Sequence, residues 1–232
     1  MVSAKQCRLG RTALDTYRSE EEQVEAIKKW WQENGTSTLL SVVVAIALVF
    51  GWRTWQDNQK SYTEAGSIAY QDLLESIAEL ETSSDDIKIA TVDYKAETLK
   101  EAHSDSGFGH MAAFFKARQA VADNDLPTAE EELRWVLENK PVFEMQMVAE
   151  LRLAKVLYAQ GLLDQAKALI DSGEKGAFKY AFMELKGDFL VIEGDYQAAV
   201  DAYTLSQDES KRLELPVPQT LAVKTIYAKS FL

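Results

Sequence analysis

The stretch from Asn34 to Trp52, NGTSTLLSVVVAIALVFGW, contains nineteen residues and no charged side chain. As an α-helix it would be about 28 Å long, close to the roughly 30 Å hydrocarbon core of a bilayer. We therefore predict a transmembrane helix at residues 34–55. Its predicted lipid-facing residues are Leu39, Leu40, Val42, Val43, Val44, Ile46, Leu48, Val49 and Phe50.

Tryptophans lie on both sides of this stretch, Trp30 and Trp31 before it and Trp52 and Trp55 after it. Tryptophan is enriched at both membrane–water interfaces, so these four side chains are predicted to lie at the two interfaces. Arg53 follows the stretch and has a side chain long enough to reach the lipid headgroups.

Two other interpretations of the apolar stretch are open. A buried helix of a soluble protein would be equally apolar, but no other segment of this chain approaches the same hydrophobicity. A cleaved signal peptide would need a small-x-small site after the apolar region, whereas residues 51–55 read GWRTW. A retained signal anchor agrees better with both observations.

Charge is divided unevenly along the chain. Residues 1–55 hold seven Lys/Arg and six Asp/Glu, whereas residues 56–232 hold eighteen and thirty-one, a net charge of −13. A domain this acidic is not expected to bind nucleic acid, because phosphates require a basic face. For the same reason it is not expected to lie flat on anionic lipid.

Basic residues near the apolar stretch indicate its orientation. Three lie within about 20 residues before it and two, Arg53 and Lys60, lie within the same distance after it. Since cytoplasmic flanks are enriched in Lys and Arg, the bias favours a cytoplasmic tail of residues 1–33 and an exported C-terminal domain. The protein would then span the membrane once, with its N-terminus inside and its large domain outside.

The tail before the anchor has two parts. Residues 1–19 show no sustained periodicity and are predicted to be disordered, and they contain the only cysteine, Cys7, so disulfides do not stabilise the large domain. From Glu20 to Asn34, apolar residues at helical spacing favour either a short amphipathic helix ending near Gly35 or a solvated lead-in.

Every later segment shows helical periodicity, and no alternating strand pattern occurs. Residues 56–107 are predicted to form a helical stem and leading helices, with a break at residues 81–84, an N-cap at Ser84 and a loop from His103 to Gly109. The predicted apolar faces of the helices include Ile68, Leu73, Leu74, Ile77, Leu80, Ile89, Val92, Ala96, Leu99, Met111, Phe114, Val121, Val136, Met147, Phe182, Leu185, Phe189, Ile192, Val223, Ile226 and Tyr227.

Three segments in the C-terminal half repeat one pattern: NDLPTA ending at Ala129, GLLDQA ending at Ala166 and GDYQAA ending at Ala199. Each begins with a turn-forming residue, has an apolar residue third and alanine sixth. A small residue lies twelve positions before each alanine and a large apolar residue four after it. The small residues, predicted to pack the helix pairs, are Ala117, Ala129, Ala154, Ala166, Gly187 and Ala199, and the large ones are Leu133, Ile170 and Tyr203.

Spacings of 37 and 33 residues between these alanines are typical of tetratricopeptide repeats, and a generic array of helical hairpins is the alternative. Lys116 and Lys186 occupy positions where that repeat usually has leucine. The predicted fold is all-α: one N-terminal transmembrane helix followed, over residues 108–232, by an α-solenoid of tetratricopeptide-like hairpins. Such a stack presents a binding face and not an enzyme cleft.

No residue pattern indicates catalysis or a cofactor. The two histidines, His103 and His110, make a poor metal site without further His or Cys, and each is expected to cap or end a helix. Nucleophile-elbow, zinc-protease and phosphate-loop motifs are absent from the sequence. We therefore predict a non-enzymatic protein with no catalytic, cofactor-binding or metal-binding residues.

The sequence resembles the YfgM-like ancillary subunit family of the SecYEG translocon of Gram-negative bacteria. The resemblance begins near Glu20 and rests on QVEAIKKWWQENG (residues 23–35), GWRTWQDNQ (residues 51–59) and the degenerate repeats. It implies an inner-membrane protein with a periplasmic repeat domain. It also implies two partners, the SecYEG translocon and a membrane-anchored periplasmic chaperone of the peptidyl-prolyl isomerase type, and no catalytic residues.

The functional hypothesis is an accessory subunit that holds a chaperone near the translocon exit and helps newly translocated polypeptides reach folding factors. An envelope-assembly or secretion scaffold with a similar protein-binding domain is the main alternative. An enzyme is a third hypothesis, which only the histidines and the acidic clusters would motivate.

Overall fold

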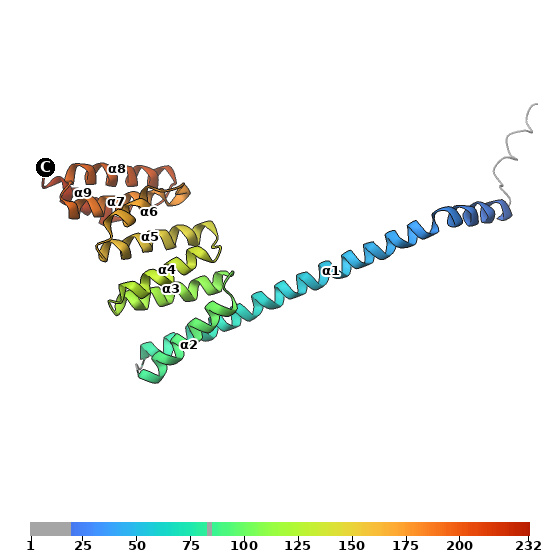
Figure 1. Cartoon of the computed structure of the whole chain (residues 1–232). Coiled ribbons are helices and arrows are strands. Elements are labelled where there is room, and N and C mark those ends of the chain that lie inside the picture. Colours follow the sequence, from blue (N-terminus) through green and yellow to red (C-terminus); the bar gives the residue numbers. More distant parts are fainter. Residues whose placement is uncertain (1–19, 83–84) are drawn as a thin grey trace, which may run out of the picture. The chain divides into compact units, whose positions relative to one another are not determined.

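The computed structural model describes residues 20–82 and 85–232. The described residues form α-helices, one short 3₁₀ helix and turns, and no strand occurs among them (Figure 1). The all-α prediction is therefore confirmed. The predicted disorder of residues 1–19 and the predicted N-cap at Ser84 lie outside the described residues.

Contacts divide the chain into two compact units, one ending at Lys60 and one from Ser61 to Leu232. The first unit contains most of helix α1 (Glu20–Thr82), a continuous helix of 63 residues. A helix end near Gly35 was predicted, and that prediction is wrong. Gly35 lacks the positive φ of a terminating glycine, and the indole ring of Trp31 lies over it.

The apolar stretch of α1 is exposed all around its circumference. Its large side chains are between 48% and 69% exposed, from Val44 to Leu48. Trp30 packs near Trp31 with ring centroids 6.5 Å apart, and Trp52 near Trp55 at 5.1 Å. Among the described residues, α1 is the one helix long and apolar enough to span a membrane. Very little of its apolar part is buried, whereas a core helix of a soluble domain would be mostly buried.

The second unit begins with a hairpin between the end of α1 and α2 (Asp86–Ala102). Leu73 of α1 packs against Val92, Ala96 and Leu99 of α2. The N-cap of α2 is Asp85, whose carboxylate accepts a hydrogen bond from the backbone N–H of Lys88 at 2.9 Å. The predicted placement of Ile89 on the buried face is wrong, because Ile89 is 47% exposed.

Three antiparallel helix pairs follow, and Figure 1 shows them stacked in chain order. They are α3 (Gly107–Ala122) with α4 (Leu126–Glu138), α5 (Phe143–Ala159) with α6 (Leu163–Asp171), and α7 (Lys179–Glu193) with α8 (Tyr196–Arg212). The 3₁₀ helix η1 (Gly176–Phe178) precedes α7, and α9 (Gln219–Lys229) ends the stack. Because α3 starts at Gly107 behind the N-cap Ser106, the predicted loop is shorter than expected.

The turns within the three pairs share one geometry. Asn124, Gly161 and Gly194 have positive φ angles of 59°, 81° and 82°, a conformation that favours glycine and tolerates asparagine. The residue after each donates its backbone N–H to the carbonyl oxygen five positions earlier, at 2.8, 2.9 and 2.9 Å. Because the three turns have the same backbone conformation, the chain reverses direction in the same way in each helix pair.

The small residues of the repeat pattern are all buried. Ala129, Ala166 and Ala199 have no exposed surface, and Ala117, Ala154 and Gly187 are also buried. The large residue four positions after each alanine, Leu133, Ile170 or Tyr203, is also buried.

Eight further side chains of the predicted apolar faces are exposed, so their predicted burial is wrong: Ile68, Leu74, Met111, Val121, Ile192, Val223, Ile226 and Tyr227. Periodicity identifies an apolar stripe but does not say how many neighbours cover it. Helix α9 is the last of the stack and packs mainly on α8, burying Leu221, Thr225 and Ala228 instead. The apolar residues on its other sides therefore remain exposed.

Candidate protein-binding face of the repeat domain

The first helices of the three pairs form one face of the stack. Helix α3 contacts α5, and α5 contacts α7. The second helices α4, α6 and α8 make fewer contacts with one another than these first helices do. In a curved stack, the helices that touch their successors lie on the shorter, inner side. We call the side formed by α3, α5 and α7 the inner face, and concave faces of this kind are where repeat proteins bind partners.

Aromatic contacts connect successive helices of the inner face. The guanidinium of Arg152 on α5 lies 4.8 Å from the ring centroid of Phe114 on α3. Tyr158 on α5 stacks on Phe189 of α7 with centroids 3.9 Å apart and planes inclined by 16°. Such contacts fix the spacing of neighbouring repeats beyond what burial of apolar area alone provides.

An ionic cluster joins α7, α8 and α9. Lys224 of α9 donates to Glu184 at 2.7 Å and to Asp188 at 2.8 Å, and the hydroxyl of Tyr203 donates to Asp188 at 2.9 Å. Burial and the hydrogen bond to Asp188 raise the pKa of Tyr203 well above its usual range. Burial alone would lower the pKa of Lys224, but its bonds to the two carboxylates outweigh that effect and raise it. The tyrosine therefore remains a neutral donor and the lysine a cation.

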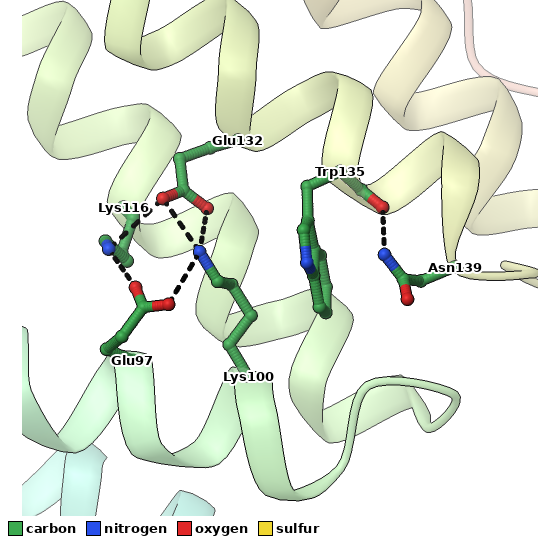
Figure 2. A network of polar contacts seen from close by, with 6 residues as sticks. All are labelled: Glu97, Lys100, Lys116, Glu132, Trp135 and Asn139. Carbon is green, nitrogen blue, oxygen red and sulfur yellow. Dashed lines mark hydrogen bonds and ion pairs between the residues drawn. The ribbon is translucent and has the colours of Figure 1, made fainter.

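A second cluster, the α2–α4 quartet of Glu97, Lys100, Lys116 and Glu132, lies between α2, α3 and α4 (Figure 2). Lys100 Nζ is 3.0 and 3.1 Å from the two oxygens of Glu132 and 3.0 Å from Glu97. Lys116 Nζ is 3.1 Å from Glu132 and also binds Glu97. Two cations alternate with two anions, so the quartet has no net charge although Glu132 is 5% exposed.

The quartet explains a departure from the repeat pattern. Lys116 occupies a position where leucine is usual, and here its ammonium bridges two carboxylates from neighbouring helices. Burial would lower the pKa of Lys116, but its bonds to Glu97 and Glu132 raise it. Burial likewise would raise the pKa of Glu97, and its bonds to Lys116 and Lys100 lower it. Lys186, the second departure, pairs with Asp171 at 2.7 Å on the surface.

The middle junction contains a buried lysine that sequence reasoning missed. Lys175, before η1, donates to Glu150 at 2.6 Å and to the carbonyl oxygen of Leu169 at 2.7 Å. Its ammonium also lies 4.2 Å from the ring centroid of Phe182. Because Lys175 lies in a connecting segment without periodicity, the sequence carries no signal for this role.

The histidines do not form a site together. His103 is the C-cap of α2, as expected, and its ring lies 4.4 Å from that of Tyr62. His110 does not end a helix, contrary to expectation: it is buried within α3 with Nε2 2.9 Å from the carbonyl oxygen of Asn139. Within residues 20–82 and 85–232, no group of three His, Cys, Asp or Glu could hold a metal ion.

Together these features define a helical repeat protein of the tetratricopeptide type, preceded by a candidate membrane span. The family model for the tetratricopeptide repeat-like domain matches residues 28–225. No solved structure matches the chain.

Several relatives are each named ancillary SecYEG translocon subunit. The relative from Aggregatibacter actinomycetemcomitans is 30% identical over 195 residues, which cover 84% of this chain and 92% of that protein. The relative from Haemophilus influenzae is 27% identical with the same coverage, and that from Escherichia coli is 27% identical over 82% of this chain and 88% of that protein. The chain belongs to the family of ancillary SecYEG translocon subunits.

Proposed function

We propose that the protein is a non-enzymatic accessory subunit of the Sec translocon, anchored in the inner membrane by residues 34–55. Its repeat domain lies in the periplasm, binds a membrane-anchored chaperone of the peptidyl-prolyl isomerase type and assists the hand-over of newly translocated polypeptides. The observation that supports this most is the combination, in one chain of this family, of an exposed apolar helix with a repeat stack that has an open inner face.

Site-specific crosslinking tests this function. A photoreactive amino acid replaces Val44 in the apolar stretch or Met111 on α3, both of which are exposed. We expect Val44 to crosslink to SecYEG subunits and Met111 to the chaperone and to polypeptides in transit. The control position is Asp201 on α8, which is also exposed but lies on a second helix and not on the inner face, and it is expected to give neither. Crosslinks to envelope-assembly proteins without SecYEG would favour the scaffold hypothesis instead.

The orientation is a separate prediction. Residues 1–33 are expected in the cytoplasm and residues 60–232 in the periplasm, because more basic residues precede the apolar stretch than follow it. Protease added to spheroplasts should therefore digest the repeat domain while a cytoplasmic marker stays intact. Protection of the domain until the inner membrane is broken would show the opposite orientation.

A further inference from the structure

Charge is distributed differently on the two sides of the repeat stack. The inner-face helices α3, α5 and α7 together carry six Lys/Arg and five Asp/Glu, a net charge of +1. The second helices α4, α6 and α8 carry four Lys/Arg and nine Asp/Glu, a net charge of −5. The inner face therefore has a positive balance within a domain that is strongly acidic.

Three cations of the inner face have no anionic partner. Arg118 on α3 and Arg152 and Lys155 on α5 are exposed, and none of them forms an ion pair with a described residue. Most other lysines and arginines of the domain are paired, as expected where carboxylates outnumber them. These three cations are thus available to an external anion.

The two arginines are positioned by aromatic rings. Arg118 lies 5.4 Å from the ring centroid of Phe115, and Arg152 lies 4.8 Å from that of Phe114. These phenylalanines are adjacent on α3, with Phe114 in the apolar core of the repeat stack and Phe115 against the apolar cluster of the α1–α2 hairpin. A guanidinium stacked on a ring keeps its N–H donors free and loses less conformational freedom when it binds a carboxylate.

Arg118 and Lys155 occupy the same position in successive repeats, one residue after the packing alanines Ala117 and Ala154. The equivalent residue of the third repeat is Asp188, which Lys224 and Tyr203 already neutralise. Two apolar side chains, the exposed Met111 and the half-buried Val148, also share one repeat position, seven residues before Arg118 and Lys155 and therefore on the same side of each helix. The inner face thus presents cations and apolar groups in its first two repeats and a closed ion pair in its third.

We propose that the inner face of α3 and α5 binds a partner segment that presents acidic side chains together with apolar ones. Carboxylates would pair with Arg118, Arg152 and Lys155, and apolar side chains would pack against Met111 and Val148. The acidic second helices repel such a segment, so binding is confined to this face. The inference rests on the proposed function, in which the repeat domain binds polypeptides, and adds the chemistry of the bound segment.

The test uses the full chain in phosphatidylcholine nanodiscs and a displayed library of random 15-residue peptides, with empty nanodiscs for counter-selection. Peptides retained by the protein are expected to be enriched in Asp and Glu. Individual binders should lose about tenfold or more in affinity, roughly 1.4 kcal/mol, in Arg118→Glu/Lys155→Glu. Added salt should weaken the binding of the parent protein.

The matched control is Lys211→Glu/Arg212→Glu, which makes the same change in net charge at two exposed positions of α8. It should alter affinity less than twofold, within the small effect expected of a distant surface charge. If the glutamate variant fails to fold, Arg118→Gln/Lys155→Gln replaces it. Retained peptides without acidic enrichment, no retained peptides, or equal losses in both double variants would overturn the inference. Because no translocon is present, such a failure leaves the crosslinking test of the proposed function unaffected.

Discussion

Replacing Glu132 with leucine is expected to lower the free energy of unfolding of the repeat domain by about 3–5 kcal/mol, the usual effect of removing one partner from a buried ion pair. Glu132 contacts both lysines of the α2–α4 quartet, and its side chain is 6% exposed. Without it, Lys100 and Lys116 share the single carboxylate of Glu97, and one positive charge at the site is left uncompensated. The neighbouring Glu131→Leu is the control, because Glu131 is exposed and should change stability little.

Urea denaturation of residues 61–232, one of the two compact units, measures both variants. Trp135 is the only tryptophan of that fragment, and its ring centroid lies 5.3 Å from Lys100 Nζ. Its fluorescence therefore reports on the quartet directly. The pKa of Glu97 is lowered in the folded state from its ordinary value of 4.5. Glu97 therefore stabilises the folded domain at a pH above 4.5, and this contribution is lost as the pH falls below that value. Equal midpoints for Glu132→Leu and Glu131→Leu would contradict the prediction.

The second large effect is expected at Gly187, where alanine should destabilise the domain by about 1–3 kcal/mol. In an ordinary helix interior the same change stabilises by about 1 kcal/mol, because glycine is a poor helix former. Here an added Cβ would lie 2.4 Å from Cε1 and 2.6 Å from Cδ1 of Tyr203. That ring is 2% exposed and its hydroxyl is bonded to Asp188, so it has no room to move.

A double-mutant cycle separates the clash from any other cause. In a Tyr203→Leu background the obstructing ring is absent, so Gly187→Ala should become neutral or stabilising. The cycle is measured by urea denaturation of the four variants. If Gly187→Ala stabilises the parent protein, α7 and α8 do not approach each other this closely at Gly187.

The sequence predicts much of this fold because its strongest signals are local and repeated. The turn residues Asn124, Gly161 and Gly194 and the aligned alanines follow one pattern, so the helix pairs could be located without a structure. Helix ends were harder to predict. Gly35 terminates nothing, because a glycine ends a helix only when it adopts positive φ, and sequence alone does not determine that.

The clusters at the repeat junctions could not be predicted, because their members come from distant positions. Lys100 and Glu132 are 32 residues apart, and Lys224 and Glu184 are 40 apart. With many carboxylates available, the sequence does not indicate which lysine binds which acid. The same limit applies to α9, whose apolar stripe at Val223 and Ile226 is exposed because none of the described helices covers it.

The contacts between successive helix pairs of this stack differ in their chemistry, so each pair fits only its own neighbours. A unit of the stack means one such helix pair. An ionic quartet joins α2 to the first pair, a buried Lys175 and stacked aromatic rings join the second pair to the third, and Lys224 joins the third to α9. Solenoids with identical interfaces can gain or lose whole units, since any unit fits beside any other. Here a duplicated or transposed unit would meet a neighbour with the wrong charges, so the units of this stack are not interchangeable.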